Sequence, residues 1–396
     1  MKLKILLCSI YFLIYYSFNL QMAASGAVAS SNKFSVDLQP VIVDGRSHEN
    51  VIYSPASIQA CMALAYLGAE GKTAQEIKNG LGLRGENKQE IAKNYGEFVQ
   101  NTFKSQSGVE LKMGNGIFVN DKLKLSPQFE ELAVKSFKSE AQSLNFADAI
   151  GSVKKINTWI EQQTNLKIQN LLQPDSINKD TSAVLANGIY FKAKWAKQFS
   201  ESFTERTKFQ LNAKEEVSVD MMFNDDSFKY GQLDDLDATA LELDYENSDF
   251  TMLFVLPNKV DGLRDLESKL RGMDLKNVAS QLRVQDIDVF LPKFKIDFEI
   301  DLKETLKKLG ISTVFSDDAD LSSLFDTKTP QKISEAKHKA YLTVNEAGSE
   351  AAAATFLKIV PMSLNLGRKV FRADHPFFFA IRNSETEFFT GHVAKF

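Results

Sequence analysis

The sequence contains few of the residues that build metal sites or disulfide scaffolds. It has two cysteines and four histidines among 396 residues, which excludes a disulfide scaffold and any site of four cysteines, or of two cysteines and two histidines. No histidines stand at metal-ligand spacing, so we expect neither a metal nor another cofactor. The chain also lacks a basic excess, because 47 lysines and arginines are outnumbered by 51 acidic residues. Nucleic-acid-binding proteins usually carry such an excess, so we expect no nucleic-acid partner.

Linkers, repeats and the common catalytic motifs are also absent. No tract rich in glycine, serine or proline divides the chain, although its length alone suggests two or three domains. Gly80 to Gly85 match the dinucleotide fingerprint, but this fingerprint requires a preceding strand. A helix is predicted before Gly80 instead, so we interpret Gly80 as its C-cap. Spacing alone does not exclude a Ser/His/Asp triad, but no motif supports one.

The N-terminus has the pattern of a secretory signal peptide. A short basic stretch precedes an almost wholly apolar run over residues 5–18, which is shorter than the ~20 residues that span a bilayer. Small residues follow, with a cleavage site near Ala24 or, alternatively, after Ala29. We therefore predict a signal peptide over residues 1–24, a secreted, extracellular protein and no membrane partner. A transmembrane anchor is the alternative interpretation.

Helix patterns are concentrated in the first half of the remaining chain. Ser54 and Pro55 are typical of an N-cap followed by proline at the first helical position. Cys61 falls on the apolar face of this helix, where we expect it to be a small core residue and not a reactive thiol. Thr73 and Glu76 have the spacing of a capping box that opens a second helix.

Strand patterns dominate the second half. Residues 251–256 form a continuous apolar run, typical of a buried strand. Residues 294–300 alternate between apolar and charged side chains, which predicts a half-buried strand. Asp301 then caps a short helix that Gly310 ends.

The segment that follows a predicted strand over residues 340–345 is rich in alanine. Such a composition normally indicates a helix or a flexible loop. Taken at a period of two, however, both charged residues, Glu350 and Lys358, fall on one face, and the other face is small or apolar. The small or apolar set comprises Ser349, Ala351, Ala353, Thr355, Leu357 and Ile359. The segment could therefore enter a sheet as a strand, and an ordinary alanine-rich loop is the alternative.

With this segment in place, several motifs along residues 30–396 resemble the signatures of one family, the serpins. In chain order they are Asn50-Val-Ile-Tyr-Ser-Pro-Ala-Ser57, Asn187-Gly-Ile-Tyr-Phe-Lys-Ala-Lys-Trp195, Leu291-Pro-Lys-Phe294, His338-Lys-Ala340, Ala373-Asp-His-Pro-Phe377 and Phe389-Thr-Gly391. Independent motifs in the right order make the resemblance specific, and on this basis the chain is identified as a member of the serpin family.

The resemblance implies an α+β fold in which helices pack on three β-sheets and a reactive-centre loop is exposed. It implies one serpin domain over residues 25–396, with the loop at about 346–372, and a monomer. It also implies that the protein is not an enzyme and that it acts on a serine protease as a suicide substrate. The protease serine attacks the scissile carbonyl to form a covalent acyl-enzyme, and the freed loop inserts into a sheet.

The resemblance extends to the hinge and the scissile bond of inhibitory serpins. Their hinge pattern is matched by Glu346, Gly348, Ser349, Glu350, Ala351, Ala352, Ala353, Ala354 and Thr355, while Ala347 stands where the family often has a charge. The scissile residue of such serpins usually lies sixteen residues beyond the hinge glutamate. This spacing gives Met362, followed by Ser363, and Val-Pro-Met-Ser resembles the bait of plasma antitrypsin.

Met362 predicts a protease with an apolar primary pocket, elastase-like first and chymotrypsin-like second, because its side chain is unbranched, apolar and adaptable. A register shifted by one residue would offer Pro361 or Ser363, which are poorer baits. Lys358 would suit a trypsin-like protease but lies four residues too early.

By the same resemblance, two groups of residues govern the opening of the sheet. Trp195 belongs to the region that opens first, and the cluster beneath the sheet comprises Ser54, Ser57, Asn187 and His338. No basic face for a glycosaminoglycan is evident. The alternative function is that of a non-inhibitory serpin, such as a carrier, a storage protein or a chaperone. Non-inhibitory members tend to carry bulky, charged or proline residues in the hinge, and this chain does not.

Overall fold

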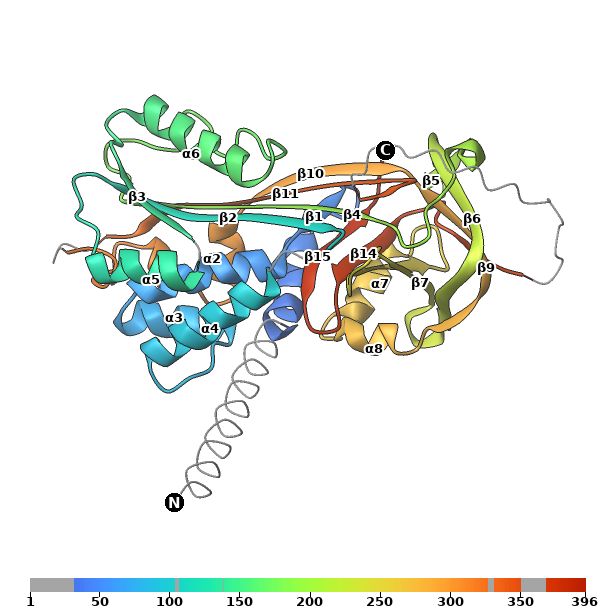
Figure 1. Cartoon of the computed structure of the whole chain (residues 1–396), viewed down its shortest axis with the longest axis horizontal. Helices are drawn as coiled ribbons and strands as arrows, with labels where there is room; N and C mark the ends of the chain where they lie inside the picture. The colour runs from blue at the N-terminus through green and yellow to red at the C-terminus, as the bar shows by residue number, and fades with distance from the viewer. Residues whose placement is uncertain (1–31, 104–106, 138, 327–330, 350–367) are drawn as a thin grey trace, which may run out of the picture.

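The computed structural model describes residues 32–103, 107–137, 139–326, 331–349 and 368–396. Within this part of the chain, helices pack around two extended β-sheets (Figure 1). The helices cover residues 32–43, α2 (Pro55–Gly68), α3 (Gly71–Leu81), α4 (Lys88–Thr102), α5 (Pro127–Phe137), α6 (Ala149–Gln163), α7 (Leu263–Leu270), α8 (Leu275–Ala279) and α9 (Leu302–Lys308). Short 3-10 turns cover η1 (Glu201–Phe203), η2 (Asp234–Leu236) and η3 (Thr313–Phe315).

The first sheet is six-stranded and runs the length of the molecule (Figure 1). Its strand order is β10 (Phe294–Asp301), β11 (Ile333–Asn345), β12 (Gly348–Ser349), β4 (Ala183–Lys194), β2 (Val109–Asn120) and β3 (Glu140–Leu144). Strands β11 and β4 pair in parallel from Ile333 opposite Ala183 to Tyr341 opposite Tyr190. Beyond Tyr341 the two strands are separated by β12, which is antiparallel to both.

The second sheet is nine-stranded. Its members are β1 (Val51–Tyr53), β15 (Glu387–Val393), β14 (Phe377–Arg382), β8 (Thr251–Pro257), β7 (Ala238–Asp244), β6 (Glu215–Leu233), β9 (Arg283–Pro292) and β13 (Lys369–Arg372), in this order, with β5 (Glu205–Asn212) paired to β6. Strand β6 has 19 residues and is long enough to pair with strands in two parts of the sheet. One part contains β5, β9 and β13, and the other runs from β7 to β1. Two of the three expected sheets are therefore joined through β6 into one hydrogen-bonded ladder.

Helix α2 lies in the middle of the core. It contacts β2 and β4 of the six-stranded sheet and β15 of the nine-stranded sheet, and all of its residues are buried. A helix enclosed in this way needs apolar residues on every side. Cys61 is among them, and burial raises the pKa of its thiol to about 12. The thiol is therefore protonated at neutral pH and serves as a core residue, as expected.

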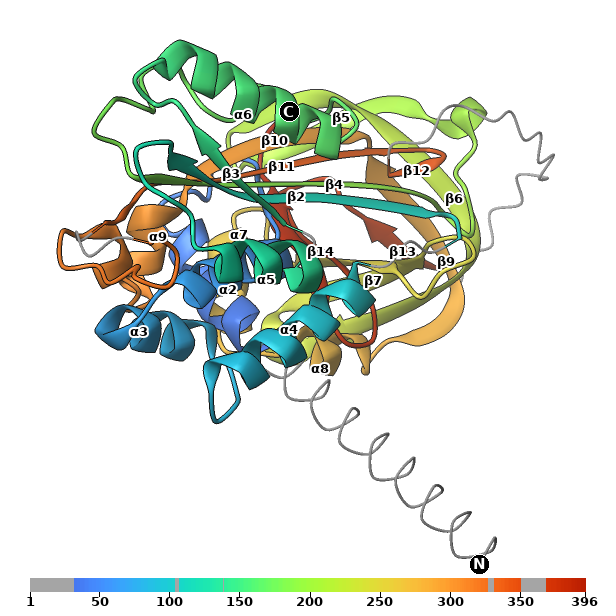
Figure 2. The same cartoon turned by 60° about the vertical axis from the view of Figure 1, so that its left-hand side comes forward.

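Helix α6 packs on the face of the six-stranded sheet opposite to α2, over β2 and β4 (Figure 2). The close approach depends on glycines in these strands. A Cβ on Gly188 would lie 2.8 Å from the Cδ1 of Ile160, and a Cβ on Gly114 would lie 2.6 Å from the same atom. These distances are below the contact distance of real Cβ atoms, so a larger residue at either position would force Ile160 or the helix to shift.

Several local predictions are confirmed. Ser54 is the N-cap of α2, where its hydroxyl accepts from the backbone N–H of Ser57, and Pro55 follows it. Asp301 caps α9, and Gly310 follows the end of that helix with a positive φ. The run over residues 251–256 is a buried strand, and residues 294–300 alternate between buried and exposed side chains.

Two local predictions are wrong. The residues predicted as a capping box do not cap α3, which begins at Gly71 with Glu70 as its N-cap. The carboxylate of Glu76 instead accepts hydrogen bonds from the backbone and hydroxyl groups of Ser312 and Thr313. The helix also continues past Gly80 and is capped by Gly82, which has the left-handed conformation.

Candidate functional site

The structure places the expected site residues in two clusters along strands β4 and β11. One cluster lies just beyond the C-terminal ends of β4 and β11, at the end that we call the top of the sheet, and contains Glu346, Gly348, Ser349 and Trp195. The other cluster lies between the sheet and the start of α2, on the face that we call the underside. The remaining expected residues lie outside the described part of the chain: Glu350, Ala351, Ala352, Ala353, Ala354, Thr355, Met362 and Ser363. The assignments of the hinge and of the scissile bond therefore stay predictions.

The lower cluster is centred on His338. Its Nε2 accepts from the backbone N–H of Ser54 at 3.1 Å. The ring proton must then lie on Nδ1, which donates to the side-chain oxygen of Asn187. The amide group of Asn187 donates to the hydroxyl of Ser57 at 2.7 Å. These four expected residues are thus brought together, and they join the start of α2 to the strand pair above it.

Burial keeps His338 uncharged. Its side chain is inaccessible to solvent, and this burial lowers the pKa of its imidazole from 6.5 to about 3. A neutral ring can accept one hydrogen bond and donate another, as the cluster requires. A charged ring could not accept from Ser54.

Asn115 is a member of the lower cluster that the sequence analysis did not find. It lies opposite Asn187 in the β2–β4 register, and its side-chain oxygen accepts from the Asn187 amide. Nothing near Asn115 in the sequence signals this role, because its partners come from strands that are distant in the chain.

Trp195 connects the end of β4 to the turn that follows β11. Its indole N–H donates to the carbonyl of Asn345 at 3.0 Å, and its backbone N–H donates to the carbonyl of Ala347 at 3.0 Å. The ring is buried and stacks on Tyr245, with ring centroids 4.6 Å apart and an interplanar angle of 13°. The tryptophan therefore holds the turn at the top of the sheet through both its backbone and its side chain.

The side chain of Glu346 is buried in the same turn. Its carboxylate accepts from the hydroxyl of Thr204 at 2.8 Å and lies 3.1 Å from the ammonium of Lys293. Its carbonyl accepts from the backbone N–H of Phe199 at 2.9 Å. A buried carboxylate without a partner would be costly, so these contacts fix where the turn starts.

Strand β12 reverses the chain into the space between β11 and β4. The side-chain oxygen of Asn345 accepts from the backbone N–H of Ala347 and of Gly348, which closes the turn. Gly348 has a φ of +152°, and a Cβ on it would lie 2.1 Å from the carbonyl oxygen of Ala193. Only glycine fits there. Ser349 follows, fully buried, between Val344 and Ala193.

The two clusters share one pair of strands. Asn187 lies in the middle of β4 and Ala193 near its end, about 20 Å apart at ~3.3 Å per residue. Between the two clusters, β11 and β4 are hydrogen-bonded directly to each other. A strand that entered below β12 would have to separate them, and it would pass His338 on its way.

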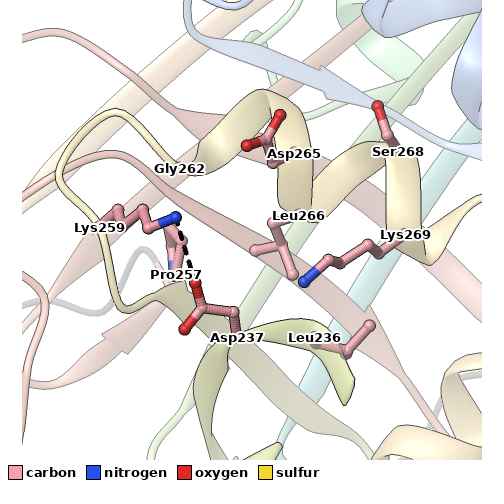
Figure 3. Close-up of a pocket in the computed structure, with 9 residues that line it drawn as sticks. All are labelled: Leu236, Asp237, Pro257, Lys259, Gly262, Asp265, Leu266, Ser268 and Lys269. Carbon is pink, nitrogen blue, oxygen red and sulfur yellow. Dashed lines mark ion pairs between the residues drawn. The ribbon is translucent and has the colours of Figure 1, made fainter. Parts of the chain in front are cut away.

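The described residues contain no group of three or more potential metal ligands, and none of their helices is long and apolar enough to cross a membrane. A hollow of about 290 Å³ lies between α7 and the end of β8 (Figure 3). Lys259 and Asp237 form an ion pair at its edge, 3.8 Å apart, and both are substantially exposed. None of the expected site residues that the structure describes lines this hollow.

Comparisons with known proteins agree with this architecture. The family model for serpins (serine protease inhibitors) matches residues 29–396. Serine protease inhibitor 42Dd of Drosophila melanogaster is 38% identical over 362 residues, which cover 91% of this chain and 95% of that protein. The chain belongs to the serpin family, a family of serine protease inhibitors and not of catalytic enzymes.

Solved structures show the same fold. A cleaved form of Serpin 42Da is 35% identical, with a TM-score of 0.85 over 94% of this chain and 99% of that chain. Human thyroxine-binding globulin complexed with thyroxine is 29% identical, with a TM-score of 0.85 over 94% of this chain and 99% of that one. The expected α+β serpin fold is therefore confirmed, and its neighbours include serpins with other functions.

Proposed function

We propose that this serpin is a secreted inhibitor that traps a serine protease as a covalent acyl-enzyme. The protease serine oxygen attacks the carbonyl carbon of Met362, an ester bond forms, and the peptide bond to Ser363 breaks. The new amine of Ser363 leaves with a proton. The freed loop then inserts into the six-stranded sheet and carries the bound protease with it.

The observation that carries this proposal is the position of β12. Two residues of the predicted hinge already lie between β11 and β4, and Ser349 is fully buried there. Insertion therefore has a defined starting point. It would continue by separating the parallel pairs from Tyr341 opposite Tyr190 down to Ile333 opposite Ala183.

The register of β12 predicts which residues would face the core after insertion. Ser349 lies opposite Val344, and side chains directly opposite each other in an antiparallel pair point to the same face. Extending this register places Ala351, Ala353 and Thr355 opposite Leu342, Ala340 and His338 in turn. The three β11 residues are buried, and the loop residues that would join them are small and uncharged.

On the outer face of the inserted strand, Lys358 would meet a residue of opposite charge. In the same register Lys358 would lie opposite Glu335, which is now paired with Lys303 at 2.7 Å. Opposite charges directly across a strand pair are favourable. Both charged residues of the segment would thus remain on the outer face, where Glu350 would lie opposite Thr343.

Met362 is the proposed bait because of its place and chemistry. It would lie just beyond the end of the inserted strand, and its apolar side chain fits the primary pocket of an elastase-like or chymotrypsin-like protease. The shifted registers at Pro361 and Ser363 remain the alternatives. They are tested by locating the cleaved bond.

A non-inhibitory function is the second candidate. Thyroxine-binding globulin, which is complexed with thyroxine in its solved structure, has the same fold, so the fold alone does not decide between inhibition and carriage. The hinge favours inhibition, because bulky or charged residues at the buried positions would oppose insertion. Here the predicted buried positions carry Ser349, Ala351 and Ala353.

The deciding experiment is denaturing gel electrophoresis after mixing the protein with elastase, chymotrypsin or trypsin. A stable band near the summed masses supports the covalent mechanism. Cleavage of the loop without such a band for all three proteases would favour the non-inhibitory candidate. Mass spectrometry of the released C-terminal fragment then locates the bond, which we expect after Met362.

Secretion and a monomeric state complete the proposal. The basic and apolar pattern of residues 1–24 supports a signal peptide. Expression in a secretory host should yield protein in the medium, and N-terminal sequencing distinguishes cleavage near Ala24 from cleavage after Ala29. A retained, membrane-bound product would support the anchor instead. Size-exclusion chromatography with light scattering tests the monomer.

A further inference from the structure

Tyr245 comes from the second sheet but reaches the hinge. It follows β7 and pairs with Trp195 through a single β-bridge. Its ring is buried between two aromatic neighbours, stacked on Trp195 and edge-on to Phe191 at a centroid distance of 5.0 Å. The ring is therefore held in one orientation before any contact with the hinge is considered.

The hydroxyl of this fixed ring meets the hydroxyl of Ser349 at 2.6 Å. Both side chains are buried, so the contact is shielded from water. The tyrosine hydroxyl also lies 3.5 Å from the sulfur of Met252, and a thioether is a weak acceptor. Withdrawal of Ser349 would leave the buried hydroxyl of Tyr245 with the weak sulfur acceptor, which opposes this withdrawal.

Ser349 is the last residue of β12 and of the described hinge. The contacts of Glu346, Ala347 and Asn345 fix the turn before it, but they do not hold the side chain that has entered the sheet. Tyr245 does. Tyr245 follows β7 and packs on Trp195 and Phe191, so its ring is held by contacts other than those with the hinge.

We propose that Tyr245 is a positioning residue for the inhibitory reaction, because its hydroxyl keeps Ser349 in the space between β11 and β4 and so sets the starting point of loop insertion. This inference rests on the proposed inhibitory function. The hydrogen bond made before cleavage is retained during insertion, so the first step is completed before the protease arrives. Insertion then competes better with hydrolysis of the acyl-enzyme.

The first test needs no protease. Tyr245→Phe removes the hydroxyl and preserves the stacked ring, and we expect amide hydrogen exchange in the peptide covering residues 342–349 to become about fivefold faster, the equilibrium effect of one net hydrogen bond. Ser349→Ala should have the same effect. The double variant should be little worse than either single variant, because both changes remove one interaction.

Tyr95→Phe is the matched control. Tyr95 is equally buried, and its hydroxyl donates to the side-chain oxygen of Gln59 at 2.9 Å, in the helical layer. We expect this variant to lose thermal stability as Tyr245→Phe does but to leave hinge exchange unchanged. An equal increase in hinge exchange would mean that general loosening, and not the hydroxyl contact, is responsible.

The second test measures the stoichiometry of inhibition with the protease that forms a covalent complex. Tyr245→Phe should be cleaved more often without trapping, so that the ratio of turnover to trapping rises about fivefold. Tyr95→Phe should match the wild type.

The outcomes separate the two proposals. Unchanged hinge exchange in Tyr245→Phe overturns the positioning role even if the wild type traps proteases. Faster hinge exchange with an unchanged stoichiometry overturns the link to insertion. Faster hinge exchange in a protein that traps no protease retains the structural contact and removes the inhibitory function.

Discussion

His338 on β11 and Asn187 on β4 face each other in parallel register, and the Nδ1–H of His338 donates to the amide oxygen of Asn187. The contact spans the pair of strands that loop insertion would separate. It also makes the strand pair sensitive to pH, since Nε2 of the same ring accepts from Ser54 and has no room for a proton.

We predict that His338 makes the native protein less stable in acid. Burial lowers its pKa to about 3, against about 6.5 when unfolded. The unfolded state therefore binds the extra proton first. The stability that this group contributes is complete above pH 6.5 and falls by up to about 1.4 kcal/mol per pH unit as the pH decreases towards 3.

Urea denaturation between pH 4 and 8 tests this prediction. His338→Gln should lose about 1–3 kcal/mol at pH 8, because buried partners are left unsatisfied, and should lack the acid slope that His338 supplies. His48→Gln, at an exposed position, should leave the curve unchanged. If His338→Gln and the wild type have the same pH dependence, His338 does not contribute to it.

Glu387 is predicted to make the native protein less stable as the pH rises, which is the opposite of the effect of His338. Its carboxylate is buried on β15, near Asp274 and Arg382, and it accepts from the hydroxyl of Ser35 and the backbone N–H of Leu275. Burial, more than any other cause, raises its pKa to about 7. The native state therefore binds the proton more tightly than the unfolded chain does, and this contribution to stability is lost as the pH rises from about 4.5 to 7.

Glu387→Gln should therefore raise the free energy of unfolding at pH 8, by up to about 3 kcal/mol, and change it little below pH 4.5. Glu385→Gln, at an exposed position two residues away, is the control. Between pH 4.5 and 6.5 the two titrations oppose each other, so each single variant should show a steeper curve than the wild type, with slopes of opposite sign. A destabilised Glu387→Gln at pH 8 would contradict the assignment.

The sequence predicted contacts within one element better than contacts between elements. Ser54 caps α2 because its partner is three residues away, and residues 294–300 alternate because their own strand is half-buried. Glu76 has the spacing of a cap, yet its partners are Ser312 and Thr313, more than 230 residues later.

In the candidate site too, the sequence identified single residues better than the contacts between elements. Family motifs pointed to His338, Asn187 and Trp195 one residue at a time, and the structure brings them together with their partners. Asn115 and Tyr245 belong to no motif, because their role depends on the register of β2 with β4 and on the end of β7 lying beside the hinge. Such positions are set by tertiary packing and have no local signal.

Met362→Arg is predicted to redirect inhibition towards trypsin-like proteases, whose primary pocket carries a carboxylate. Inhibition of elastase should fall strongly, because a charged side chain cannot be buried unpaired in an apolar pocket. Second-order inhibition rates with elastase and trypsin check this. Lys358→Ala is the matched variant: it removes a charge from the loop but should keep elastase as the preferred protease and Met362 as the cleaved residue. Main cleavage after Lys358 or Arg368 would show that the proposed scissile bond is wrong.

The hinge supplies the last prediction, and its two adjacent positions give a matched pair of variants. Ser349 is fully buried beside Tyr245, so Ser349→Arg would place a charge in a closed space at an effective cost of several kcal/mol. The strand β12 should leave the sheet, and insertion after cleavage should slow. If the register of β12 continues, Glu350→Arg would place its side chain on the opposite face, where a long charged side chain could reach solvent.

Acylation at Met362 is unchanged in both variants, because the bait is the same. Slower insertion gives water more time to hydrolyse the acyl-enzyme, and each 1.4 kcal/mol on the insertion barrier changes this partition about tenfold. Ser349→Arg should therefore be cleaved at the same bond and released as a substrate, whereas Glu350→Arg should still trap the protease. Gel electrophoresis and titration of residual protease activity measure both outcomes. If Ser349→Arg traps protease with near-unit stoichiometry, then either the loop does not insert or it inserts in a register different from that of β12.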